Sequence, residues 1–172
     1  MHRAIIAGMA LATLSGPVAA QTAKNRQAIE GRFRIFDSRD PVDDKRTLHA
    51  IIGTQGKHVA VGCSDHEGGG LQVVAKFDQY VGDAKPGLLA GGRLIYYRFD
   101  DQPALSGHWH SWDSTVATGE NASPAAFVEG LAGSTRLFLR TEDYDGRQVE
   151  MAYTYPDPSE ELKTVLAYCR AK

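Results

Sequence analysis

The chain has 172 residues, a hydrophobic content of 42% and a formal net charge of −2 at pH 7. This length fits one domain with its own core. The nearly balanced charge argues against a nucleic acid or an anionic membrane as partner, because both need clustered Lys and Arg. No apolar run reaches the roughly 20 residues that span a bilayer, so we expect no transmembrane segment.

The first twenty residues predict a secretory signal peptide. A short basic start ends at Arg3, an apolar stretch runs from Ala4 to Leu14, and small side chains at 18–20 precede the expected cleavage before Gln21. We therefore expect an exported protein that works in the periplasm or is secreted.

The rest of the chain divides into a polar lead-in over residues 21–32 and a single β-rich domain over residues 33–172. Within this domain, short apolar runs alternate with Gly, Asp and Pro, which is typical of an antiparallel β protein. Strands are expected at 33–36, 47–52, 58–63, 71–77 and 94–99. The run 94–99 is bulky at both sets of alternate positions, which favours a central strand covered on both faces.

Two further strands and a short helix are expected towards the C-terminal end. Runs 135–140 and 148–153 flank Asp145-Gly146, and Asp-Gly is a strong signal for a hairpin turn. Before this hairpin, Ser123 can cap a short helix that starts at Pro124.

The last segment predicts an amphipathic helix. Asp157 can cap it and Pro158 suits its first position. One face then follows the i, i+3, i+4, i+7 spacing and carries Leu162, Val165, Leu166 and Cys169. The expected fold is mainly β, an antiparallel β-sandwich or curved sheet with a short helix and this C-terminal helix packed on it, and α+β by strict count.

The two cysteines, Cys63 and Cys169, are the only ones in the chain. Both fall on apolar faces, one of a strand and one of the terminal helix, and an isolated pair in an oxidising compartment favours a disulfide. Closing a loop of about 100 residues would stabilise the fold by about 4 to 5 kcal/mol in the chain-entropy model.

A possible metal site involves three histidines. His108 and His110 alternate on one strand face, where two imidazoles can hold one ion, and His66 could supply a third ligand. The alternative is that these histidines are polar surface residues. The site would make the protein a metal-dependent hydrolase, but no catalytic motif is recognised, so we expect no enzyme, no catalytic residue and no cofactor.

Aromatic residues are the candidate contacts for a partner. Trp109 and Trp112, together with His108 and His110, could form a binding surface. Tyr96 and Tyr97 are further candidates, although core packing explains the two tyrosines better.

An arginine patch is a second candidate surface. Arg136 and Arg140 share a strand face with Glu150 on the neighbouring strand. The plain interpretation is a solvated face with exposed ion pairs, and the alternative is a patch for an anionic ligand.

Several short motifs follow one another in a defined order. They are the acidic turn 38–44, the strand 59–63 that ends in Cys63, the strand 97–100, Trp109, a short helix with Phe127, and the helix 162–169 that ends in Cys169. In this order the chain resembles the type VI secretion-associated VasI-like periplasmic proteins. The resemblance implies a small exported β-rich accessory protein of a secretion or envelope system, without catalytic activity.

Three hypotheses about function therefore stand. The first is a non-enzymatic interaction module whose partner is an envelope or secretion-system protein. The second is a secreted inhibitor or small-ligand-binding protein that uses the loops around Gly68 and His108. The third is the metal-dependent hydrolase.

Overall fold

The structure is a computed structural model that describes residues 28–65, 70–82, 92–118 and 123–171, with only the backbone of Trp112. These residues form ten strands and two helices, and eight of the strands precede the first helix. The strands are β1 (Ile29–Glu30), β2 (Arg34–Arg39), β3 (Arg46–Gly53), β4 (His58–Ser64), β5 (Gln72–Lys76), β6 (Gly92–Phe99), β7 (Leu105–Trp112), β8 (Thr115–Thr118), β9 (Arg136–Glu142) and β10 (Gln148–Thr154). The helices are α1 (Pro124–Ala132) and α2 (Ser159–Arg170).

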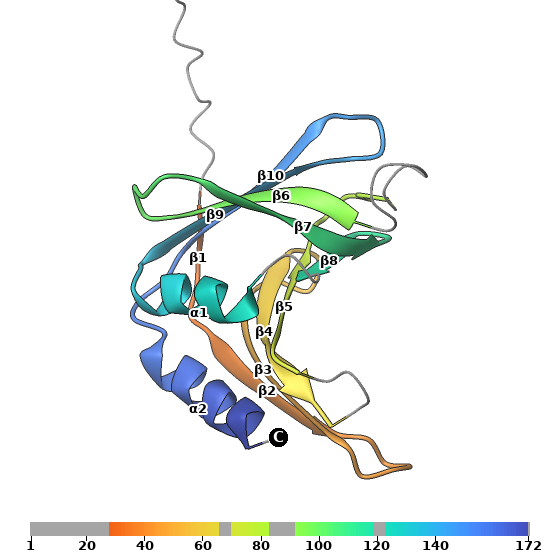
Figure 1. Ribbon diagram of the computed structural model, residues 1–172, viewed down its shortest axis with the longest axis vertical. Helices are drawn as coiled ribbons and strands as arrows, with labels where there is room; N and C mark the ends of the chain where they lie inside the picture. The colour runs from red at the N-terminus through yellow and green to blue at the C-terminus, as the bar shows by residue number, and fades with distance from the viewer. Residues whose placement is uncertain (1–27, 66–69, 83–91, 119–122, 172) are drawn as a thin grey trace, which may run out of the picture.

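All ten strands belong to one curled sheet in the order β1-β10-β9-β6-β7-β8-β5-β4-β3-β2. Every neighbouring pair is antiparallel except β1 and β10, which are parallel. In Figure 1 the sheet folds back on itself, with β6, β7, β9 and β10 above β2 to β5. The expectation of a mainly β protein with a curved antiparallel sheet is thus confirmed.

The curl brings the two edge strands close together. β1 and β2 lie at opposite ends of the strand order, yet only Gly31, Arg32 and Phe33 separate them in the sequence. Three intervening residues reach at most about 14 Å even when fully extended. The turn between β3 and β4 also contacts β10, since Lys57 Nζ donates to the Glu150 carbonyl at 3.3 Å. The sheet therefore encloses its own core.

Helix α1 contributes Phe127 to a cluster of aromatic rings in this core. The Phe127 ring lies 5.0 Å from the ring of Tyr97, 5.2 Å from Phe99 and 5.5 Å from Trp109, measured between centroids. Ser123 caps the helix, because its side chain accepts a hydrogen bond from the Ala126 amide at 3.2 Å. The predicted cap and helix are confirmed.

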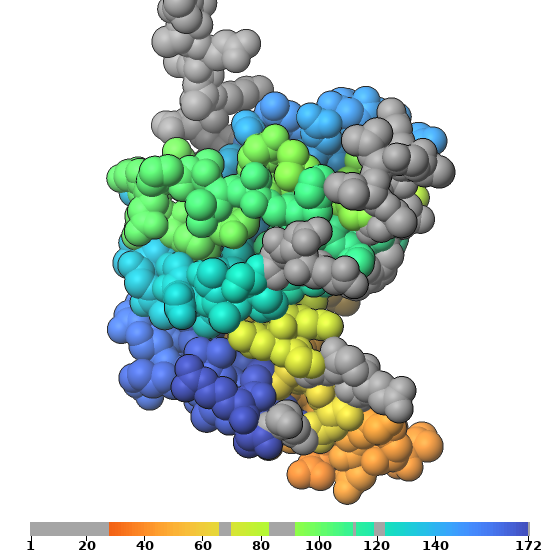
Figure 2. Space-filling model, in the orientation of Figure 1, coloured from red at the N-terminus to blue at the C-terminus, as the bar shows by residue number. Residues whose placement is uncertain are grey.

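Helix α2 closes the other side of the core and is tied to β4. Cys63 and Cys169 form a disulfide with their Cα atoms 5.8 Å apart, as predicted. The buried side chains of Leu162 and Val165 face the sheet. Tyr168 near the helix end donates its hydroxyl to the Arg46 carbonyl at 3.2 Å. In Figure 2 the blue surface of α2 lies directly below the cyan surface of α1.

Several elements differ from the prediction. β2 continues to Arg39, into the expected acidic turn, and β8 lies where the sequence predicts no strand. Helix α2 begins at Ser159, one residue later than expected, and the prediction of Asp157 as its cap is wrong: Pro158 is the N-cap residue, while Asp157 accepts from the Ser159 amide at 2.9 Å. The segment expected as a polar lead-in contributes Ile29–Glu30 as strand β1, which pairs with β10. The expected signal peptide lies outside the described residues. In the described part of the chain, no helix is long and apolar enough to cross a membrane.

The predicted hairpin of β9 and β10 is confirmed, and Asp143 organises its turn. Its largely buried carboxylate accepts from the amides of Asp145 at 2.9 Å and Arg147 at 2.8 Å, and from Arg147 Nε at 3.0 Å. Gly146 adopts a φ of 80°, which the Asp-Gly turn signal anticipates. The backbone hydrogen bond from Arg147 is the main reason why the pKa of Asp143 is lowered.

Replacing Asp143 with Asn should lower the melting temperature in a pH-dependent way. A lowered pKa in the folded protein means that the charged carboxylate stabilises the fold above its ordinary pKa of 3.8, and that this stabilisation disappears as the pH falls through the lower folded value. Melting curves of both proteins should therefore differ near neutral pH and converge in strong acid. Asp145→Asn, on the same turn but exposed, is the control, and an equal change in both variants would contradict the assignment.

Candidate functional site

The ladder between β6 and β9 is shorter than either strand. Its last pair is Tyr96 opposite Arg140. Beyond this pair β6 continues to Gly92 alongside β7, and β9 continues to Glu142 alongside β10. The two hairpins therefore separate, as Figure 1 shows at the tip of β9 and β10.

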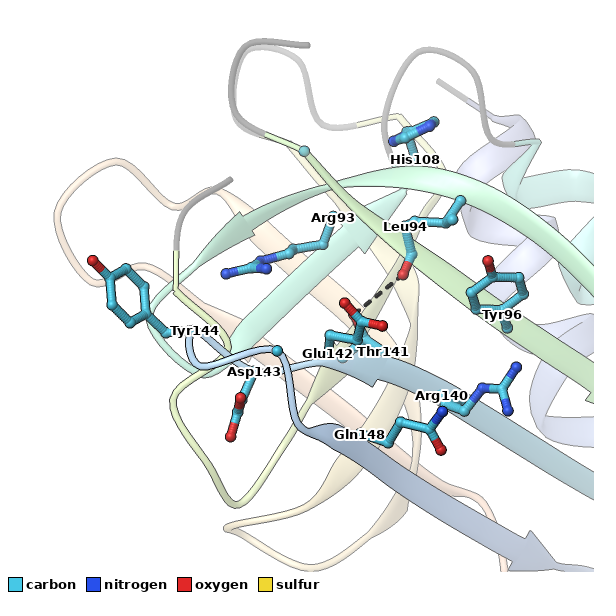
Figure 3. Close-up of a pocket in the computed structure, with 12 residues that line it drawn as sticks. Arg93, Leu94, Tyr96, His108, Arg140, Thr141, Glu142, Asp143, Tyr144 and Gln148 are labelled. Carbon is cyan, nitrogen blue, oxygen red and sulfur yellow. Dashed lines mark hydrogen bonds between the residues drawn. The ribbon is translucent and has the colours of Figure 1, made fainter. Parts of the chain in front are cut away.

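This separation forms a half-open groove of about 510 Å³, which we call the split groove. Its volume lies within the range of about 300 to 1,000 Å³ that is usual for ligand pockets. Figure 3 shows that its walls come from both hairpins and from the turn between β9 and β10. The lining residues that carry the argument are Leu94, Tyr96, His108, Arg140, Glu142 and Tyr144.

The floor of the groove is held by a side-chain hydrogen bond. Thr141 Oγ1 donates to the Leu94 carbonyl at 3.2 Å, the contact drawn as a dashed line in Figure 3. Thr141 is buried, so this contact ties the hairpins together from the inner side. The groove is thus a shallow site on the outer face of the sheet, with a closed floor.

Apolar side chains are exposed on this outer face. Leu94 is 38% exposed and Tyr96 is 37% exposed, whereas Ile95 between them is fully buried. The prediction that the strand 94–99 is covered on both faces is therefore wrong for the outer face. Its central position is right, since β6 lies between β7 and β9. Both sets of alternate positions are bulky because one set faces the core and the other faces the groove.

Arg140 places a positive charge over the aromatic floor. Its guanidinium lies 5.0 Å from the centroid of the Tyr96 ring, a cation–π arrangement. Arg93 also lines the groove, and its Nε donates to the Gly82 carbonyl at 3.5 Å. Glu142 contributes a carboxylate to the same groove. The groove therefore combines an apolar and aromatic floor with both signs of charge.

The two candidate arginines have different surroundings. Arg136 forms an ion pair with Asp101 at 2.8 Å, in agreement with the plain interpretation of a solvated face. Arg140 lies opposite Glu150 in the ladder but also lines the groove. Of the two arginines, Arg140 therefore stays the candidate for binding an anionic ligand.

Trp109 does not contribute to a surface. It points to the inner face of β7, is 0% exposed and contacts the rings of Tyr97 and Phe127. The expected contact role of Trp109 is therefore wrong, because alternation along β7 directs its side chain into the core. Core packing, the preferred explanation for the tyrosines, is right for Tyr97 and wrong for Tyr96, which is exposed. The side chain of Trp112 lies outside the description.

The histidine pair lies on the outer face of β7, as its spacing predicts. His108 lies at the rim of the groove, opposite Leu94 in the ladder with β6. The second histidine, His110, is exposed. His66 and the loop around Gly68 lie outside the described residues. Among the residues that the structure describes, no group of three or more His, Cys, Asp or Glu side chains could hold a metal ion.

Comparisons with protein-family models, with curated proteins and with solved structures find no match to this chain. The function is therefore inferred from the split groove and its chemistry.

Proposed function

We propose that the protein is a non-enzymatic binding module of the cell envelope, and that it recognises its partner through the split groove. The observation that carries this proposal is the guanidinium of Arg140 over the exposed ring of Tyr96, in a groove that the exposed Leu94 also lines. Aromatic and arginine side chains dominate binding energy at interfaces when they come together in a pocket.

The location in the envelope is supported by the disulfide between Cys63 and Cys169. Such bonds form and persist in oxidising compartments such as the periplasm. The predicted signal peptide and the resemblance to VasI-like proteins agree with an exported accessory protein, and on this basis the partner is an envelope or secretion-system protein.

Site-specific photo-crosslinking tests this proposal in the native host. A photoreactive phenylalanine analogue replaces Tyr144, which is 60% exposed at the rim of the groove, or Val42, which is 93% exposed in the turn between β2 and β3. The Tyr144 position should give discrete adducts with exported proteins, identified by mass spectrometry, and the Val42 position should not give them.

The variant Leu94→Asp provides the specificity control. A charge on the apolar floor should reduce the Tyr144 adducts at least about tenfold, because an unpaired charge is costly to bury in an interface. Identical adducts from both crosslinker positions, or adducts that Leu94→Asp leaves unchanged, would contradict a role of the groove. Adducts without any secretion-system subunit would contradict only the assignment to that system.

A further inference from the structure

The split groove is closed at one end. β6 and β9 are not paired with each other near the turn of the β9 and β10 hairpin. Their ladder begins at the pair Tyr96 and Arg140. An extended ligand that lies along the strands therefore stops at this pair. A polypeptide can meet such a closed end only with a chain terminus or a sharp turn.

The charge at the closed end selects one kind of terminus. The Arg140 guanidinium lies over the Tyr96 ring at this pair, and Glu150 lies opposite Arg140 in the ladder with β10. A guanidinium presents a planar fork of donors that matches a carboxylate through two parallel hydrogen bonds. Because the fork is already oriented, less conformational entropy is lost on binding.

The ligand is held by side chains and not by added strand pairing. The Leu94 carbonyl points across the split and already accepts the Thr141 hydroxyl at 3.2 Å. Neighbouring strands lie about 4.7 to 4.9 Å apart, so this contact leaves no room for a further strand between β6 and β9. A ligand therefore lies over the closed floor, against the exposed side chains of Leu94 and Tyr96.

Towards the open end, the groove carries both signs of charge. Glu142 and Arg93 line this part, beside the exposed ring of Tyr144 and the apolar Leu94. An apolar side chain upstream of the terminus therefore meets Leu94 and Tyr144.

We infer that the split groove binds the C-terminal end of a polypeptide, with Arg140 holding the terminal carboxylate and Leu94 and Tyr96 contacting apolar side chains. The ligand is a short, extended C-terminal segment with apolar residues next to its end. This inference rests on the proposed function of the groove and names the chemistry of its partner.

The test uses an array of hexapeptides with varied sequence, made once with free C-terminal carboxylates and once as C-terminal amides. Peptides that bind the purified exported protein are then measured by fluorescence anisotropy. Hydrogen bonds to charged groups contribute about 1.5 to 3 kcal/mol, so amidation should weaken each binding peptide about 10- to 100-fold.

Two arginine variants make the test specific. Arg140→Gln should weaken the free acids about as much as amidation does and should leave the amides unchanged. Arg98→Gln is the matched control, because Arg98 lies on the neighbouring strand β6 with its guanidinium 5.9 Å from the Phe138 ring but does not line the groove. It should bind both peptide forms like the unchanged protein, and circular dichroism checks that both variants are folded.

The possible results separate the two proposals. Peptides that bind equally as acids and amides, but are weakened by Leu94→Asp, would overturn carboxylate recognition and leave the groove as a binding site. Absence of binding by every peptide would also overturn it, while specific Tyr144 crosslinks would still support the binding module. Acid-selective binding that Arg140→Gln does not change would place the site elsewhere and overturn the inference.

Discussion

Replacing Cys63 and Cys169 together with alanine is expected to lower the free energy of unfolding by about 4 to 5 kcal/mol. The disulfide closes a loop of 106 residues between β4 and α2, and its loss allows the unfolded chain many more conformations. The folded state keeps its other contacts to α2, including the buried side chains of Leu162 and Val165. The effect should therefore appear mainly as lost stability, with little change in the far-UV circular dichroism of the folded protein.

Urea unfolding at equilibrium measures this difference, with the free energy extrapolated to water. Reduction of the unchanged protein should bring its stability close to that of the double variant, whereas the double variant should not respond to the reductant. A loss below about 1 kcal/mol would show that the denatured chain is already restricted in other ways, and the chain-entropy explanation would then fail.

Replacing Phe127 with alanine is expected to destabilise the protein by about 3 to 5 kcal/mol. Its ring is 1% exposed and contacts the rings of Tyr97, Phe99 and Trp109. Truncation removes apolar contacts and leaves a cavity between α1 and the sheet, and the well-packed surroundings can collapse into it only in part.

The same urea experiment measures this loss, and the fluorescence of the neighbouring Trp109 reports whether the core is loosened. Glu129→Ala is the control, since Glu129 is exposed on the same helix. Its effect should stay within about 0.5 kcal/mol. A similar small effect of Phe127→Ala would mean that α1 is not part of the cooperative core.

The candidate groove was only partly visible in the sequence. Bulky residues at both sets of alternate positions along 94–99 suggested two covered faces, whereas Leu94 and Tyr96 are exposed in the groove. Arg140 was a candidate for an anionic ligand, but its aromatic support by Tyr96 comes from the neighbouring strand. Sequence patterns report which residues are apolar or charged, and they do not report which surface remains without a covering layer.

Gly62 shows the same limit within the core. The strand pattern treats it as one more position between Val61 and Cys63, yet a Cβ atom there would meet the His49 ring and the Leu48 carbonyl of β3. The need for glycine arises from a close approach of two strands. Nothing in the local sequence of β4 indicates how closely β3 approaches.

The sequence alone was sufficient for features that depend on local periodicity and on the number of cysteines. These are most of the strands, the hairpin turn at Asp145-Gly146, the Ser123 cap of α1 and the pairing of Cys63 with Cys169. The placement of β9 beside β6, the pairing of β1 with β10 and the early end of the ladder at Tyr96 required the folded chain. Pairing between distant strands depends on how the curled sheet encloses its core, and this packing involves residues that no local window contains.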